Sequence, residues 1–137
     1  MKETFHLKNN LSEIDRLANI VLKFGKHNNL DEEIIGDLRL VLDEIVTNII
    51  SYGYENNTDQ QICICICYTD DEIRVEVKDE GIPFNPIEAS GPDIEKPFEE
   101  RETGGLGIYI VRKLMDELEY RSIEGKNILI MKKHLKN

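Results

Sequence analysis

The stretch that decides the fold is "LRLVLDEIVTNIISYGY", Leu38 to Tyr54. Its apolar residues recur at helical spacing, so it predicts a helix with one strongly apolar face. Glu44 and Asn48 lie on neighbouring turns along one border of that face, since side chains four residues apart project the same way. Two interpretations stay open. The pair belongs to a solvated helix face, or it borders a cleft where Asn48 offers a neutral oxygen to a hard cation and Glu44 accepts a proton.

The composition is that of an ordinary globular domain. The chain has 137 residues, 40% hydrophobic and 32% charged, with a formal net charge of −10. The acidic balance argues against nucleic acid as the main partner, because phosphate neutralisation needs clustered Lys and Arg. No signal peptide is recognisable, and no apolar run approaches the roughly 20 residues that a membrane span needs. We therefore expect one cytoplasmic domain over residues 1–137, without membrane association.

The order of the expected elements predicts the architecture. A strand near "ETFHL" precedes a helix capped by Asn10 or Ser12, and a second helix covers about 31–51. The alternating runs "QICICICY" and "EIRVEVKD" predict an antiparallel hairpin. Helical spacing resumes over 106–118, and a last hairpin should turn at 124–127. Because strands come in adjacent pairs, we expect an α+β, two-layer α/β sandwich, with a mostly antiparallel sheet covered on one face by three helices.

The run "VEVKDEGIPFNP" places a carboxylate on the apolar side of a predicted strand. Asp79 continues the parity of Ile73, Val75 and Val77, so we expect it to face the core. A carboxylate there needs a hydrogen-bond donor, or its burial costs several kcal/mol. A backbone amide is one candidate donor. The amino group of a purine is another, and Gly81 would let a planar ring approach the backbone.

A glycine cluster in "ETGGLGIYIV" stands directly before the third predicted helix, at Gly104, Gly105 and Gly107. Such a cluster either makes a simple turn or exposes amide groups that cradle a phosphate together with the helix N-terminus. It is not a Walker motif, because no Gly-Lys-Ser/Thr is present. The preceding segment, 82–103, holds all four prolines and shows no sustained periodicity, which is typical of a functional lid or of disorder.

The three cysteines, Cys63, Cys65 and Cys67, alternate along one predicted strand. Their odd number and spacing indicate reduced thiols on one face rather than a disulfide framework. We interpret them as small apolar strand residues. A shared zinc ion is not favoured, because neighbouring same-face positions on a strand are roughly 7 Å apart and the three histidines show no metal-ligand spacing.

Taken together and in this order, the segments resemble the GHKL superfamily of ATP-binding domains, whose fold is the Bergerat-type, histidine-kinase-like ATPase fold. "DEIVTNIISYGYEN" is similar to its N box, "DEGIPFNP" to its first glycine box and "TGGLGIYIV" to its second. The segment 82–103 would be the ATP lid between the two glycine boxes. Within the superfamily, the chain is similar to the bacterial anti-sigma-factor serine/threonine kinases, which are free-standing ATP domains.

The resemblance implies a role for each matching residue. Glu44 would be the general base toward a partner's acceptor serine, and Asn48 would hold Mg²⁺ that bridges the phosphates of ATP. Asp79 would accept a hydrogen bond from the adenine amino group, with Gly81 beneath the ring. The residues that would close over the phosphates are Thr103, Gly104, Gly105, Leu106 and Gly107.

The resemblance also implies an activity and partners. The chain would be a Mg-ATP-dependent serine/threonine protein kinase that phosphorylates an anti-anti-sigma (STAS-type) protein, binds a sigma factor and forms a homodimer. The alternative is a non-catalytic, nucleotide-dependent partner-binding module of the same fold. Two departures bear on phosphotransfer rather than on nucleotide binding. Tyr52 stands where this branch often has histidine, and Thr103 stands where some members carry an arginine, with Arg101 two residues earlier.

Overall fold

The computed structural model describes residues 1–52, 60–81 and 105–135, so the expected lid over 82–103 lies outside the described residues. Within these ranges lie five strands and three helices, in the order that the sequence predicts. The elements are β1 (Lys2–Lys8), α1 (Glu13–His27), α2 (Glu32–Tyr52), β2 (Gln61–Tyr68), β3 (Glu72–Asp79), α3 (Gly105–Leu114), β4 (Glu117–Ile123) and β5 (Lys126–His134).

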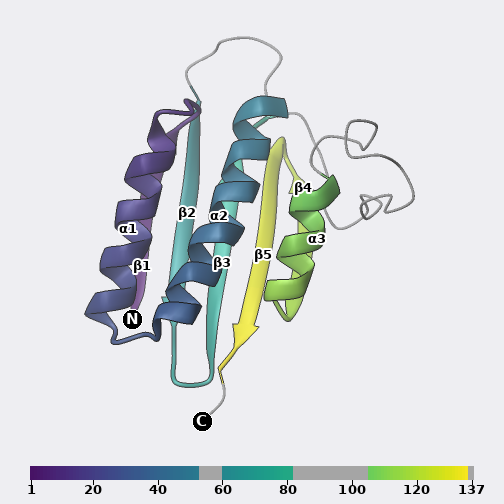
Figure 1. Ribbon diagram of the computed structural model, residues 1–137. Helices are drawn as coiled ribbons and strands as arrows, with labels where there is room; N and C mark the ends of the chain where they lie inside the picture. The colour runs from purple at the N-terminus through teal and green to yellow at the C-terminus, as the bar shows by residue number, and fades with distance from the viewer. Residues whose placement is uncertain (53–59, 82–104, 136–137) are drawn as a thin grey trace.

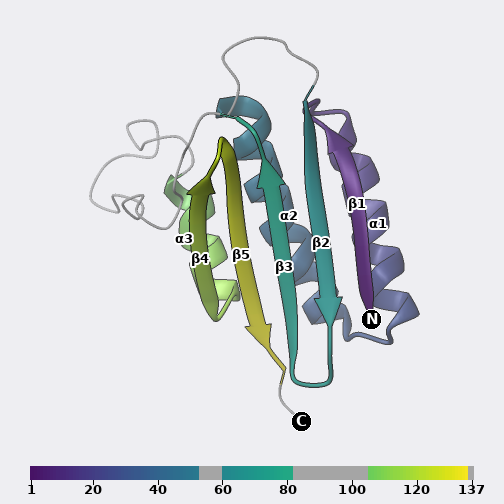
Figure 2. The same cartoon turned by 180° about the vertical axis from the view of Figure 1, so that it is seen from behind.

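The described strands form one antiparallel sheet in the order β1-β2-β3-β5-β4. The last hairpin therefore joins the sheet through β5, which places β3 in the centre and β4 at an edge. All three described helices lie against one face of this sheet, and none of them covers the other face (Figure 1, Figure 2). The predicted two-layer α+β sandwich is confirmed.

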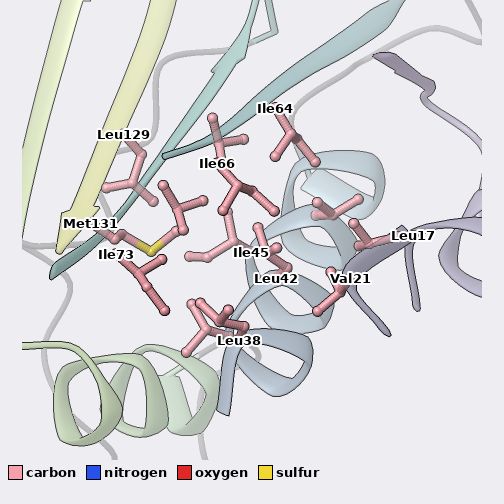
Figure 3. Packing of buried hydrophobic residues seen from close by; sticks show 14 of the residues in the cluster. Leu17, Val21, Leu38, Leu42, Ile45, Ile64, Ile66, Ile73, Leu129 and Met131 are labelled. Carbon is pink, nitrogen blue, oxygen red and sulfur yellow. The ribbon is translucent and has the colours of Figure 1, made fainter. Parts of the chain in front are cut away.

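The core lies between the sheet and the helices. It consists of the apolar residues that alternate along the strands and recur at helical spacing along the helices. The helix-facing residues of β2 and β3 are almost fully buried: Ile62, Ile64, Ile66, Ile73, Val75 and Val77. The face of α2 that opposes them is equally buried: Leu38, Val41, Leu42, Ile45 and Val46. Figure 3 shows how these layers meet, with side chains of α1 and β5 closing the two sides. Because burying one such side chain stabilises the fold by about 1.5–3 kcal/mol, this apolar face determines which side of α2 meets the sheet.

Local hydrogen bonds explain where α1 begins and where it ends. Ser12 occupies the N-cap position without a side-chain hydrogen bond, whereas Asn10 Oδ1 accepts the Ser12 amide at 3.0 Å. Of the two predicted capping residues, Asn10 therefore makes the side-chain contact. At the other end Asn29 adopts a φ of 56°, and the Leu30 amide donates to the Gly25 carbonyl at 2.9 Å. A left-handed residue with such a returning hydrogen bond is a common helix stop.

The third helix is shorter than its apolar spacing predicts, because α3 ends at Leu114 and Leu118 belongs to β4. The Asp116 amide donates to the Lys132 carbonyl at 2.8 Å, so the chain joins the sheet at this point. Lys133 Nζ donates to the Leu114 carbonyl at 2.8 Å and satisfies one of the free carbonyls at the helix end. Leu118 still packs against the core, but it does so from a strand.

The final hairpin turns over two residues. Glu124 and Gly125 have φ values of 51° and 79°, as a type I′ turn requires, and β5 begins at Lys126. The predicted turn over 124–127 was therefore too long. The difference matters for the site, because Asn127 is a buried strand residue rather than part of a turn.

Candidate functional site

Three segments that are far apart in the sequence meet at one end of the molecule. The C-terminal half of α2, the carboxyl end of β3 and the N-terminal end of α3 all point to the same end of the sandwich (Figure 1). In addition, α2 packs against α3. The fold thus brings the helix that carries Glu44 and Asn48 to the same end as Asp79 and the start of α3 at Gly105.

Asp79 is the last residue of β3 and is only 8% exposed, on the side that the helices cover. Its Oδ1 accepts two hydrogen bonds, from the Gly81 amide at 2.8 Å and from Asn127 Nδ2 at 3.1 Å. The backbone-amide interpretation of this carboxylate is therefore correct for one of its oxygens. Within the described residues no donor reaches Oδ2, so Oδ2 can accept a hydrogen bond from a ligand.

Asn127 is a candidate site residue that sequence reasoning missed. It lies opposite Asp79 in the β3–β5 pairing and is 5% exposed. Its Nδ2 also donates to the Gly81 carbonyl at 2.9 Å, and the Tyr120 hydroxyl donates to its Oδ1 at 2.8 Å. A usable signal was present, because Asn127 shares the parity of buried Leu129, just as Asp79 shares that of its apolar neighbours.

Asn48 carries an unsatisfied polar group. The residue is half-buried on α2, and its Nδ2 is buried without a hydrogen-bond partner in the described part of the chain. Leaving a buried donor unpaired costs about 1–3 kcal/mol, so such a group calls for a physical reason. Asn48 Oδ1 makes no hydrogen bond with the other described residues, so this oxygen can coordinate a cation.

The side chains near Asn48 could hold Mg²⁺ only if substrate phosphates supply most of its ligands. Among the described residues, no three or more His, Cys, Asp or Glu side chains gather closely enough to hold a metal ion. Mg²⁺ usually keeps several waters and takes one or two protein oxygens, with the remaining ligands from substrate phosphates. Asn48 therefore suits an ion that is bound together with phosphates and does not suit an ion caged by protein.

Two neighbouring carboxylates on α2 differ in their surroundings. Glu44 is half-buried and makes no hydrogen bond or ion pair with the other described residues. Asp43, which sequence reasoning missed, has its Oδ1 buried without a partner in the same part of the chain. Burial raises the pKa of Asp43; Arg39 opposes this rise and Asp15 of α1 adds to it. We found no signal in the sequence that singles out Asp43.

The glycine cluster is shifted relative to the prediction. Because α3 begins at Gly105, the first helical turn includes Gly105, Leu106 and Gly107, which were expected to stand before or at its start. The backbone amides of a first turn have no partner within the helix, and they carry the positive end of its dipole. This geometry suits an anion such as phosphate. Thr103 and Gly104 lie outside the described residues.

Lys133 ties α3 to α2. Besides its bond to the Leu114 carbonyl, Lys133 Nζ lies 3.3 Å from Asp37 Oδ2, and the two charged side chains are 18% and 21% exposed. One cation thus joins the C-terminal end of α3 to the first half of α2. Since both helices contribute to the site, this contact helps to hold their mutual orientation.

The three cysteines are free and half-buried, and they alternate along β2 with the buried isoleucines, so they lie on the sheet face opposite the helices. The Sγ atoms of Cys65 and Cys67 are 3.9 Å apart. Burial raises the pKa of the Cys67 thiol, and its contact with Cys65 adds to the rise.

No helix in the described ranges is long and apolar enough to cross a membrane.

An antiparallel sheet with three helices on one face is the architecture of the histidine-kinase-like ATPase fold, and the buried acid and the helix N-terminus lie at the same end of it. The family of histidine kinase-like ATPase domains matches residues 7–133. The chain belongs to this family, as its three motifs predict, and membership implies the use of ATP.

Two curated relatives show which members of this family the chain is similar to. The serine-protein kinase RsbW of Bacillus cereus (strain AH187) is 32% identical over 102 residues, which cover 72% of this chain and 63% of that relative. The chain thus matches less than two thirds of the length of RsbW. The anti-sigma F factor of Clostridium acetobutylicum (strain ATCC 824) is 33% identical over 124 residues, covering 89% of this chain and 86% of that relative.

Solved structures support the fold. The histidine kinase domain from the Erythrobacter litoralis EL346 blue-light activated histidine kinase superposes with a TM-score of 0.52. The two share 15% sequence identity, and the match covers 90% of this chain and 59% of that chain. At this identity the likeness concerns architecture alone.

Proposed function

We propose that this protein is a Mg-ATP-dependent serine/threonine protein kinase and anti-sigma factor. It would phosphorylate a small anti-anti-sigma (STAS-type) protein and bind a sigma factor in a switch governed by nucleotide state. The names of two relatives, a serine-protein kinase and an anti-sigma F factor, support this assignment. The observation that carries it is the buried carboxylate of Asp79, held through one oxygen while the other can take a ligand's donor.

The nucleotide would lie across the end of the sheet. Asp79 Oδ2 accepts a hydrogen bond from the adenine amino group, and Gly81 lies beneath the ring. The backbone amides of Gly105, Leu106 and Gly107, with Thr103 and Gly104 before them, bind the phosphates at the positive end of α3. The lid over 82–103 would close this pocket.

The transfer step would use the two polar residues of α2. Asn48 contributes its carboxamide oxygen to Mg²⁺. When bound, Mg²⁺ neutralises charge on the phosphates during transfer. Glu44 orients the hydroxyl of the partner's acceptor serine or threonine and accepts its proton. Phosphoryl transfer depends on positioning and charge neutralisation more than on covalent chemistry by the protein. A carboxylate such as Glu44, which makes no hydrogen bond or ion pair with the other described residues, is suited to this role.

A labelling experiment tests the kinase. The protein is incubated with γ-labelled ATP and an anti-anti-sigma (STAS-type) protein from the same organism. We expect the partner to be labelled by the wild type and by Glu33→Ala, which alters an exposed carboxylate in the first turn of the same helix. We expect Glu44→Ala to bind ATP and transfer nothing. If the wild type binds Mg-ATP and labels no partner, the kinase is refuted and the non-catalytic binding module remains.

Separate measurements test binding. Mg-ADP at a hundred times its dissociation constant should raise the free energy of unfolding by about 2.7 kcal/mol; no increase would exclude the nucleotide site. A pull-down with ADP-loaded and ATP-loaded protein should retain a sigma factor in a nucleotide-dependent manner. We also propose a homodimer, which light scattering would detect as twice the mass of 15.9 kDa.

A further inference from the structure

The side chain of Asn127 is held by hydrogen bonds to Asp79, Gly81 and Tyr120. It lies opposite Asp79 on β5, and its Nδ2 donates both to Asp79 Oδ1 at 3.1 Å and to the Gly81 carbonyl at 2.9 Å. An amide nitrogen has two hydrogens, so these bonds use its full donor capacity. Asn127 therefore links the carboxylate of Asp79 to the backbone at Gly81.

The orientation of this carboxamide is dictated by its neighbours. A carboxylate and a backbone carbonyl can only accept hydrogen bonds, so the nitrogen of Asn127 must face Asp79 and Gly81. Its oxygen then faces the Tyr120 hydroxyl at 2.8 Å, and Tyr120 must be the donor. The result is a directed series of hydrogen bonds from Tyr120 through Asn127 to Asp79, with no member free to reverse.

This series holds Asp79 in one rotational state. Oδ1 is held from two sides, by the Gly81 amide at 2.8 Å and by Asn127, so the carboxylate cannot turn without breaking both bonds. Oδ2 is then a fixed acceptor at the end of the sheet. A fixed acceptor favours a ligand that presents a donor there, and it disfavours a ligand that presents another acceptor.

We propose that Asn127, oriented by Tyr120, is a positioning residue that makes the site selective for purines with a 6-amino group over purines with a 6-oxo group. The inference rests on the proposed nucleotide binding, and it deepens it by assigning base selectivity to residues that act through Asp79 rather than by touching the base. Without Asn127, the carboxylate would have to be ordered by the ligand itself, and the Gly81 carbonyl would lose its donor.

Base selectivity is measured as the ratio of the dissociation constants of IDP and ADP, by titration calorimetry with Mg²⁺ present. The two nucleotides share ribose and phosphates and differ at the purine 6-position. The wild type should prefer ADP. Asn127→Leu, which keeps the branching at Cγ and removes both donors, should lower the ratio about tenfold, as expected for one hydrogen bond. Tyr120→Phe, which removes only the hydroxyl, should lower it by a smaller factor of about three.

A control separates positioning from loss of stability. Ile66→Val shortens a fully buried side chain of β2, away from the strand end, and destabilises the fold without touching the hydrogen-bond series. Its selectivity ratio should equal that of the wild type. A purely structural role for Asn127 predicts instead that the ratio follows stability in all three variants.

The outcomes are distinct. A folded Asn127→Leu variant with the wild-type ratio overturns the inference while nucleotide binding stands. If Asn127→Leu does not fold, Tyr120→Phe decides alone, and an unchanged ratio overturns the inference. A wild type that binds neither nucleotide refutes the proposed function and this inference together. A wild type that binds ADP selectively but labels no protein partner refutes only the kinase.

Discussion

Replacing the carboxylate of Asp79 with a carboxamide, Asp79→Asn, should exchange the base preference of the site while leaving the fold in place. The new amide can put its oxygen where Oδ1 stands and still accept from the Gly81 amide and Asn127 Nδ2, which lie at 2.8 and 3.1 Å in the wild type. In that orientation the amide nitrogen takes the place of Oδ2. The group that faces the ligand thus changes from an acceptor to a donor.

The magnitude follows from the bond that is lost. A hydrogen bond to a charged acceptor contributes about 1.5–3 kcal/mol, so ADP should bind about 10- to 150-fold more weakly. IDP presents an oxygen at the purine 6-position, so it gains a neutral hydrogen bond of about 0.5–1.5 kcal/mol and should bind about 2- to 12-fold more tightly. Because both Oδ1 contacts are kept, the free energy of unfolding should change by no more than about 1 kcal/mol.

Titration calorimetry with Mg²⁺ and either nucleotide, together with urea denaturation, measures all three quantities. Asp70→Asn is the matched control, because it makes the same chemical change at an exposed residue of the β2–β3 turn. A variant that binds ADP as the wild type does would show that Asp79 does not contact the 6-amino group. Equal weakening of ADP and IDP would show a general loss of the site rather than a change in selectivity.

Three further predictions concern the frame of the site. In Gly25→Ala the new Cβ would overlap Cγ1 and Cδ1 of Ile35, so urea denaturation should show a loss of about 1–3 kcal/mol; the effect should be non-additive with Ile35→Ala, and additivity within about 0.5 kcal/mol would refute the overlap. Lys133→Met removes bonds at 2.8 and 3.3 Å and should cost about 2 kcal/mol in the same assay, whereas an unchanged denaturation midpoint would refute its bridging role. Because burial raises the native pKa of Asp43, the wild type loses stability as pH rises from the ordinary aspartate pKa through the native pKa of Asp43. Asp43→Asn should therefore be more stable than the wild type at pH 7, with a gain that shrinks as pH falls through that window, and a gain independent of pH would contradict this cause.

Local periodicity predicted most elements and the faces that they bury. It was wrong at α3, because the apolar spacing that begins at Leu106 continues to Leu118, and a leucine that faces the core satisfies a helical and a strand pattern alike. Only pairing with β5 shows where the helix stops, since the Asp116 amide bonds to a carbonyl of that strand.

Some residues of the candidate site could be predicted from local spacing, and one could not. Asp79 could be predicted because its parity within one strand places it among buried residues, and Asn48 because its spacing from Glu44 places both at the border of an apolar face. Their roles stay predictions that the experiments above address. Asn127 gave an equivalent signal, but its importance depends on which strand lies beside β3, and local spacing does not determine strand order.

By itself, the sequence determined which residues form helices and strands, which sides of them are apolar and where three family motifs stand, because those properties depend on side chains a few residues apart. Only the tertiary structure decided that β5 rather than β4 pairs with β3, in the register that sets Asn127 against Asp79. The physical reason is that strand order and register depend on the free energy gained when the apolar face of the sheet is buried against α1, α2 and α3. That free energy belongs to contacts between distant segments and is carried by no single segment alone.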